Sequence, residues 1–326
     1  MMPTAIQRLL IPLLLLATIV AALLSTRLGS VSLGWVEWWT ALFNPAAEHG
    51  DVLWRLRLPR LAAAWSVGAL LSLSGCLMQV LLRNPLADPY ILGVSGGAAF
   101  AALLGISLGV TASFVPALAL LGALFSVLLV FGLARGEGPW SSTRLLLTGV
   151  VTASGWAALI SLILALGSDS SLRGMLFWLI GDLGYARAPA WSFVTLALAF
   201  GLCLALARSL NVLAMGETTA RLLGESTERL LWLLYLLASV LTATAVSIAG
   251  SIGFVGLIVP HLIRLLVGAD HRRLLPAATL FGGLFLVVAD TLARTILAPR
   301  QLPVGVITAL LGVPLFLLLL NRARLK

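Results

Sequence analysis

The chain has 326 residues, of which 60% are hydrophobic and only 10% are charged, and its mean hydropathy is +1.09. An average soluble domain carries about 25% charged residues, so this polar surface is too small to cover a water-facing globule. A soluble enzyme and a disordered chain are therefore excluded. The formal net charge of +9 does not indicate nucleic acid as a partner, because the cytoplasmic loops of membrane proteins are enriched in Lys and Arg.

The hydrophobic residues fall into blocks of about 15–25 residues, the length that a helix needs to cross about 30 Å of hydrocarbon. These unbroken blocks lack the alternation of a membrane β-strand. We therefore expect an all-α, polytopic membrane bundle that forms one domain over residues 1–326, with both termini cytoplasmic and lipid around it. The expected segments, in chain order, are 9–27, 61–82, 91–108, 114–134, 143–166, 190–207, 230–249, 256–268, 274–296 and 304–321.

A weak similarity between two segments of the sequence suggests an internal repeat. Gly75 precedes Pro85 in SGCLMQVLLRNP, and Gly250 precedes Pro260 at the same spacing in AGSIGFVGLIVP. The expected segments run in opposite directions at these two places, which would make the repeat inverted, a common arrangement in transporters. Two matches at one spacing are equally well explained by chance.

The sequence lacks the residues of a catalytic site. Its single lysine is the last residue, Lys326, so the chain carries no phosphate-binding loop of the Gly-rich type that ends in Lys. Its three histidines, His49, His261 and His271, are spread along the sequence without the spacing of a metal site or a triad. We expect no enzyme activity, no metal and no cofactor on this chain, and any ATP-driven work would be done by another subunit.

Asp290 is the best candidate for an acid buried in the membrane, which a proton-coupled transporter would need. It lies four residues before Arg294, and this spacing puts both side chains on one helix face. A local ion pair is the simpler interpretation.

Positive charge gathers at the predicted outer side. Arg55, Arg57 and Arg60 precede the second segment, with Pro59 suited to a first helical turn, and Arg294 and Arg300 follow from the ninth. This placement opposes the rule that favours basic residues inside. Either the side chains snorkel to lipid headgroups, or they form a docking surface for an acidic patch on an extracytoplasmic partner.

The longest polar loop on the predicted inner side reads RSLNVLAMGETTARLLGESTERLL. Residues 218–223 favour a short helix that Gly224 ends, and Ser226 is placed to cap the helix that follows. Such a helix could act as a lever for a cytoplasmic subunit, or the segment could be a plain turn. Ser142 and Thr143 begin the fifth segment, where their hydroxyls could either cap the helix or close the inner end of a pathway.

Three stretches of the sequence resemble one family. RLPRLAAAWSVGALLSLSGCLMQVLLRNPLADPYILGVSGGAAF, GSIGFVGLIVPHLIRLLVGADHRRLLP and ADTLARTILAPRQLPVGVITALLGVPLF are similar to segments of the membrane permeases of bacterial ABC importers for iron–siderophore complexes, haem and cobalamin. With MGETTARLLGES they recur in family order over about residues 55–320. The resemblance implies ten helices, a homodimer with a central path, two ATP-hydrolysing partner subunits that hold ATP-Mg, a periplasmic binding protein, and the bacterial inner membrane.

The resemblance also implies roles for individual residues. Arg57, Arg60 and Arg294 match arginines that salt-bridge to the binding protein, while the roles of Arg55, Arg300 and His261 stay open. Ser142 and Thr143 match a cytoplasmic gate, with their order swapped relative to the cobalamin version. The coupling loop that seats in the ATPase matches residues 214–226, including Gly216, Glu217, Ala220, Arg221 and Gly224.

The resemblance does not separate the substrates of the family. We expect a ferric siderophore or haem because such members are the more numerous, with cobalamin as the alternative. From a different class, an ion-coupled secondary transporter would need a titrating acid such as Asp290 and no ATPase.

Overall fold

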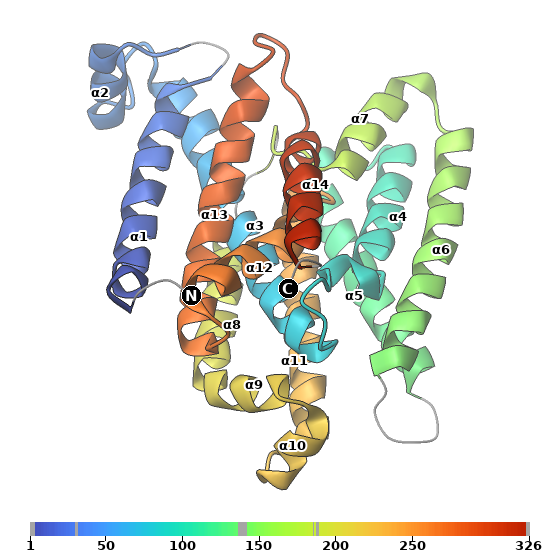
Figure 1. Cartoon of the computed structure of the whole chain (residues 1–326). Coiled ribbons are helices and arrows are strands. Elements are labelled where there is room, and N and C mark those ends of the chain that lie inside the picture. Colours follow the sequence, from blue (N-terminus) through green and yellow to red (C-terminus); the bar gives the residue numbers. More distant parts are fainter. Residues whose placement is uncertain (1–3, 30–31, 136–141, 185, 187–188, 324–326) are drawn as a thin grey trace.

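The computed structural model describes residues 4–29, 32–135, 142–184, 186 and 189–323, and within them every regular element is a helix (Figure 1). In chain order the elements are α1 (Thr4–Arg27), α2 (Trp35–Phe43), the π-helical turn η1 (Val52–Arg57), α3 (Leu58–Leu81), the 3-10 turn η2 (Pro89–Leu92), α4 (Val94–Ser107), the 3-10 turn η3 (Ala112–Phe114), α5 (Val115–Ala134), α6 (Ser142–Leu166), α7 (Asp169–Ile180), α8 (Ala190–Ala205), α9 (Ala207–Ala214), α10 (Glu217–Leu222), α11 (Thr227–Ala249), α12 (Val255–Val267), α13 (His271–Thr295) and α14 (Val304–Ala323).

Each of the ten predicted segments coincides with a helix, which confirms the membrane bundle. By length and composition, six helices of the described chain could cross a membrane, and a seventh span results if α8 and α9, bent by 63°, count as one. The predicted segments that fall on α4 and α12 are shorter apolar helices of 14 and 13 residues, whereas the last segment falls on α14, which has 20. Proline and glycine at the start of α4, and inside and at the end of α12, explain why these two are short.

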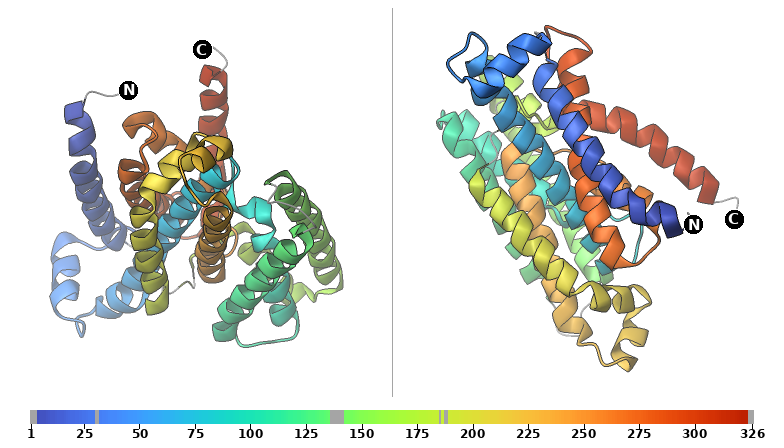
Figure 2. Two further views of the ribbon diagram at one scale, coloured as in Figure 1. Left: turned by 90° about the horizontal axis from the view of Figure 1, so that it is seen from below. Right: turned by 90° about the vertical axis from the view of Figure 1, so that its left-hand side faces the viewer.

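Helix α3 forms the centre of the bundle, and it is buried almost all round. A helix that is apolar on every face belongs in a core, and α3 packs against α11, α12 and α13 (Figure 2). Small hydroxyls join it to its neighbours: Ser72 Oγ donates to the Ala278 carbonyl at 2.7 Å and Ser74 Oγ to the Ala238 carbonyl at 2.8 Å. This interface of small residues and interhelical hydrogen bonds is the usual one for helices in lipid.

The chain turns between α3 and α4, at the place where its two prolines predict a break in the helix. The Asp88 side chain caps η2 by accepting from the Tyr90 amide at 2.8 Å. Gly93 then adopts φ +71°, a left-handed conformation that suits glycine, before α4 begins.

Three features differ from the sequence-based expectation. The short helices α2 and α7 lie outside the ten expected segments, and at nine and twelve residues neither is long enough to span lipid. The two similar segments do not occupy equivalent positions in the fold. Gly75 lies inside α3, whereas Gly250 caps the end of α11. Pro85 lies in a turn, whereas Pro260 lies inside α12.

Candidate functional site

A cavity of about 510 Å³ lies beside the start of α3, where most of the predicted outer arginines gather. It is formed by η1, the first turn of α3, the end of α13, and residues from the connections between α1 and α2, α2 and η1, α7 and α8, and α13 and α14. Its lining includes Arg55, Arg57, Arg60, Arg294, Gln301, Pro59, Leu56, Val52, His49, Leu33, Gly29, Gly184 and Ala186. The cavity is therefore the structural counterpart of the predicted positive cluster.

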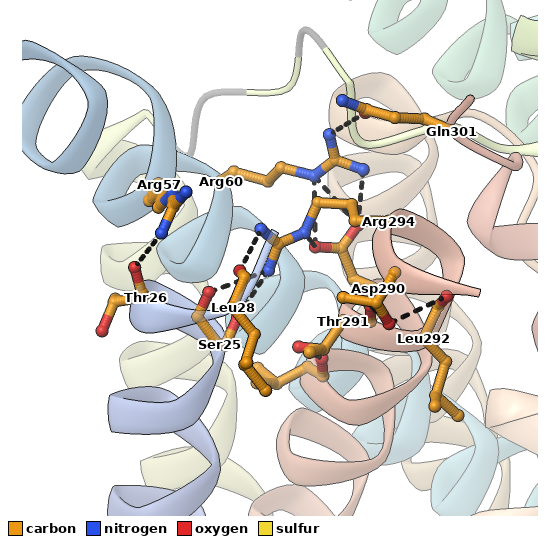
Figure 3. A network of polar contacts seen from close by, with 12 residues as sticks. Ser25, Thr26, Leu28, Arg57, Arg60, Asp290, Thr291, Leu292, Arg294 and Gln301 are labelled. Atoms are coloured by element: carbon orange, nitrogen blue, oxygen red, sulfur yellow. Dashed lines mark hydrogen bonds and ion pairs between the residues drawn. The ribbon is translucent and has the colours of Figure 1, made fainter. Parts of the chain in front are cut away.

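Asp290 is the central residue of this cluster (Figure 3). Its carboxylate, only 1% exposed, accepts from Arg60 Nε and Nη2 at 3.0 and 2.8 Å and from Arg294 Nε at 3.0 Å. Arg60 Nη1 also donates to Gln301 Oε1 at 2.7 Å. The predicted pair of Asp290 with Arg294 is confirmed, and Arg60 from α3 joins it to form a buried triad that ties α3 to α13.

The other contacts of these arginines secure the end of α1. The last carbonyl groups of a helix have no partner inside the helix and attract positive charge. Arg57 Nη1 donates to the carbonyls of Thr26 and Arg27 at 2.8 and 2.7 Å, and Arg294 Nη2 donates to the carbonyl of Ser25 at 3.0 Å. The first and ninth predicted segments are thus joined at one point (Figure 3).

Of the two interpretations of the positive cluster, snorkelling to lipid headgroups does not describe its three central arginines. Arg57, Arg60 and Arg294 are 8%, 8% and 5% exposed, because their guanidinium groups turn inward to the carboxylate and carbonyl partners. Arg55 does reach the surface, where it pairs with Asp51 at 2.9 Å, and Arg300 is exposed as well.

The cavity holds more positive than negative charge among these groups. Three buried guanidinium groups, those of Arg57, Arg60 and Arg294, line it, and the Asp290 carboxylate pairs with the last two of them. Burial raises the pKa of the neighbouring Asp182 carboxyl, the Asp290 charge acts in the same direction, and Arg60 opposes it. The cavity is suited to an acidic group.

The second candidate site is the loop formed by α9 and α10. Residues 218–223 were expected to be helical, and α10 covers 217–222. Gly224 follows it with φ +86°, and the Glu225 amide donates back to the Ala220 carbonyl at 3.0 Å, which is the ending that glycine was predicted to provide. Ser226 stands at the start of α11, as expected, but its side chain makes no capping hydrogen bond.

Side chains hold α10 against the rest of the protein. Ala220 is fully buried, Glu217 pairs with Arg221 within the helix and with Arg83 at 3.8 Å, and Arg221 Nε donates to Thr227 Oγ1 at 3.0 Å. Gly216, which precedes the helix, has φ +119°, a conformation that is open essentially to glycine alone. The five residues of the predicted coupling loop therefore all have a structural part in placing α10.

An apolar surface faces away from these contacts. Met215, Leu222 and Leu223 are 69%, 83% and 63% exposed. Figure 1 shows α10 at the end of the bundle opposite α2. Contiguous exposed apolar groups at the end of a loop are typical of a protein contact.

Asn211 connects the loop to the membrane bundle, a link that the sequence pattern did not reveal. Its Oδ1 accepts from the His271 amide at 2.9 Å and lies 2.7 Å from His271 Nδ1, while its Nδ2 donates to Asp270 at 2.8 Å. Asp270 in turn caps α13 by accepting from the Arg272 amide. His271 takes part in this contact at the start of α13, where it is 2% exposed.

The predicted gate residues do not lie with either group. Helix α6 begins at Ser142, as expected, and Thr143 is exposed in the single chain. His261 lies in α12, partly exposed, and its Nδ1 has no hydrogen-bond partner. Within the described residues no three metal-ligating side chains gather.

The chain matches the FecCD transport family model over residues 15–322 and belongs to this family. It is 41% identical to the hemin transport system permease protein HmuU of Yersinia pestis, covering 97% of this chain and 96% of that protein. It is 41% identical to the Fe(3+) dicitrate transport system permease protein FecD of Escherichia coli, with 93% and 95% covered. A solved structure, described as an inward-facing conformation of a proposed metal-chelate type ABC transporter, is 33% identical, has a TM-score of 0.83, and matches over 97% of this chain and 99% of that one.

The protein is thus a multi-pass permease subunit of a bacterial ABC importer, a transport component without an ATPase domain. The alternative of an ion-coupled secondary transporter is overturned by this membership. The geometry agrees, because two guanidinium groups engage the Asp290 carboxylate that the alternative required.

Proposed function

We propose that this permease carries a bulky metal chelate, a ferric siderophore or haem, from the periplasm to the cytoplasm across the bacterial inner membrane. The main support is that two relatives that match this chain over almost their whole length are permeases named for the transport of hemin and of ferric dicitrate. Cobalamin is the alternative, because the vitamin B12 import permease of Citrobacter koseri is 37% identical over 88% of each chain. Two copies would form the path between them, and two ATP-binding subunits would supply the energy.

Each candidate site has one role in the proposed transport cycle. The outer cavity with Arg57, Arg60 and Arg294 would receive an acidic side chain of the periplasmic binding protein. Helix α10, with exposed Leu222 and Leu223, would sit in the ATPase, so that ATP binding shifts the helix and changes which end of the dimer is open. Ser142 and Thr143 would close the cytoplasmic end of the path.

A binding assay tests the substrate. The cognate periplasmic protein is titrated with ferric siderophores, haem and cobalamin, and the retained compound is then offered to the full transporter in proteoliposomes. We expect tight binding and ATP-dependent uptake of an iron chelate or haem. Retention and uptake of cobalamin alone would contradict the assignment and support the alternative.

Glycine substitutions test the coupling loop. We expect Gly216→Ala and Gly224→Ala to lower the amount of chelate transported per ATP hydrolysed, Gly216→Ala the more, since its backbone conformation would cost a side chain about 1–3 kcal/mol. Gly174→Ala is the control, because this glycine lies inside α7 with open space around it. Equal transport-to-hydrolysis ratios in all three variants would contradict the role of α10.

Asn211→Ala tests the link from the loop to α13. It removes three contacts at once without touching α10, so we expect ATP hydrolysis to persist while uptake falls about tenfold. The matched control is Asn44→Ala, an exposed turn asparagine near α2 that accepts from the Ala46 amide. Uptake and hydrolysis that fall together would mean that Asn211 supports assembly and does not transmit motion.

A further inference from the structure

Helix α2 presents three distinct faces. At about 100° per residue, Trp35, Val36, Trp39 and Phe43 form one continuous arc, and they are 62%, 77%, 58% and 70% exposed. Glu37 and Thr40 form the adjoining exposed polar arc. Trp38 and Ala41 form the third face, which is buried.

The buried face fixes α2 rigidly to the outer end of the bundle. Trp38 and Ala41 pack with Leu33 and Leu53 in a small core of their own. Trp38 Nε1 donates to Thr26 Oγ1 at 3.1 Å, and Trp54 Nε1 donates to the Ala41 carbonyl at 3.0 Å. These contacts of the buried face therefore hold the exposed arc in one orientation.

The exposed arc lies beside a helix whose own exposed side chains are those of a membrane span. Along α1, which is apolar enough to span the membrane, most of the exposed side chains are leucine, isoleucine and valine, among them Leu13, Leu16 and Ile19. Figure 1 and the left view of Figure 2 both place α2 at the edge of the molecule beside the end of α1, with the bundle on one side only. The Arg27 guanidinium lies 4.1 Å from the Trp35 ring, so a basic group adjoins the aromatic arc at this end of α1.

We propose that α2 is an interfacial helix whose arc of Trp35, Val36, Trp39 and Phe43 inserts into the headgroup–acyl boundary of the outer leaflet. Tryptophan is enriched at this boundary because its ring is apolar while its N–H is polar. An amphipathic helix that lies in the membrane plane buries its apolar face and keeps its polar face in water. Glu37 and Thr40 supply that polar face.

This anchor has a consequence for the outer cavity. The Thr26 hydroxyl accepts a hydrogen bond from the Trp38 indole N–H, and the Thr26 carbonyl accepts one from the Arg57 guanidinium. The depth of α2 in the bilayer therefore fixes the depth of the cavity relative to the membrane surface.

Spin labels on the two exposed arcs test the proposal. Val36→Cys and Phe43→Cys report on the apolar arc, and Glu37→Cys and Thr40→Cys are matched controls on the same helix. The native Cys76 and Cys203 are buried, and the unmodified chain serves as the labelling blank. In phospholipid nanodiscs we expect labels at 36 and 43 to collide several-fold more with oxygen than with a water-soluble nickel chelate, and those at 37 and 40 to show the reverse.

Three results of the labelling experiment would overturn the proposal. Equal nickel accessibility at all four positions would place the whole helix in water. Protection at 36 and 43 that arises only on adding the periplasmic partner would assign the arc to that protein, and protection that depends on a second copy would assign it to the dimer. As an independent readout, quenching by lipids brominated near the headgroup should fall when Trp35→Phe and Trp39→Phe are combined, and unchanged quenching would contradict the insertion.

Discussion

Replacing Asp290 with alanine is expected to destabilise the permease more than any other single carboxylate substitution at its outer end. The change leaves the guanidinium groups of Arg60 and Arg294 buried without their shared carboxylate. Breaking a buried ion pair by removing one partner costs about 3–5 kcal/mol. The thermal midpoint of the purified transporter in detergent measures the loss.

The control for this prediction is Asp51→Ala. Its carboxylate pairs with Arg55 at 2.9 Å, but the two side chains are 76% and 77% exposed, and a surface pair contributes about 0–1 kcal/mol. Equal midpoints for the two variants would show that the Asp290 triad does not hold α3 and α13 together.

Arg57→Gln is expected to lower the affinity of the permease for the periplasmic binding protein at least tenfold, a loss of about 1.4 kcal/mol or more of binding free energy. Arg57 lines the outer cavity and donates to the backbone carbonyls of Thr26 and Arg27, whereas Arg60 and Arg294 hold Asp290. Removing its charge therefore tests docking with less damage to the triad. The salt dependence of binding should also become shallower, because one charge fewer attracts the partner.

Arg173→Gln supplies the comparison for docking. It removes the same charge from the exposed surface of α7, outside the lining of the cavity. Surface plasmon resonance against nanodisc-held transporter measures both variants. An unchanged affinity for Arg57→Gln, or equal losses for the two, would contradict docking at the cavity.

Local patterns in the sequence predict much of this structure because they depend on neighbouring residues. Hydropathy places the ten segments, the i, i+4 spacing pairs Asp290 with Arg294, Pro59 falls in the first turn of α3, and Gly224 ends α10. Each of these depends on contacts within a turn or two of helix, and the residue types alone are enough to identify it.

Long-range contacts could not be predicted in this way. Arg60 and Asp290 are 230 positions apart, and Asn211 lies 60 positions from His271, so no spacing signal relates them. Arg57 is buried because the end of α1 lies against it in the folded protein, and a single sequence does not show this contact. The helix α2 was missed for a different reason: a nine-residue run of aromatic and polar residues does not have the length of a span.

The central claim is that this chain is a passive path driven by separate ATPase subunits. It is tested by uptake of the radiolabelled chelate into proteoliposomes that contain the permease with or without those subunits, in the presence of the loaded binding protein and internal ATP. We predict accumulation against the gradient only when the ATPase subunits are present. Accumulation by the permease alone would contradict the account.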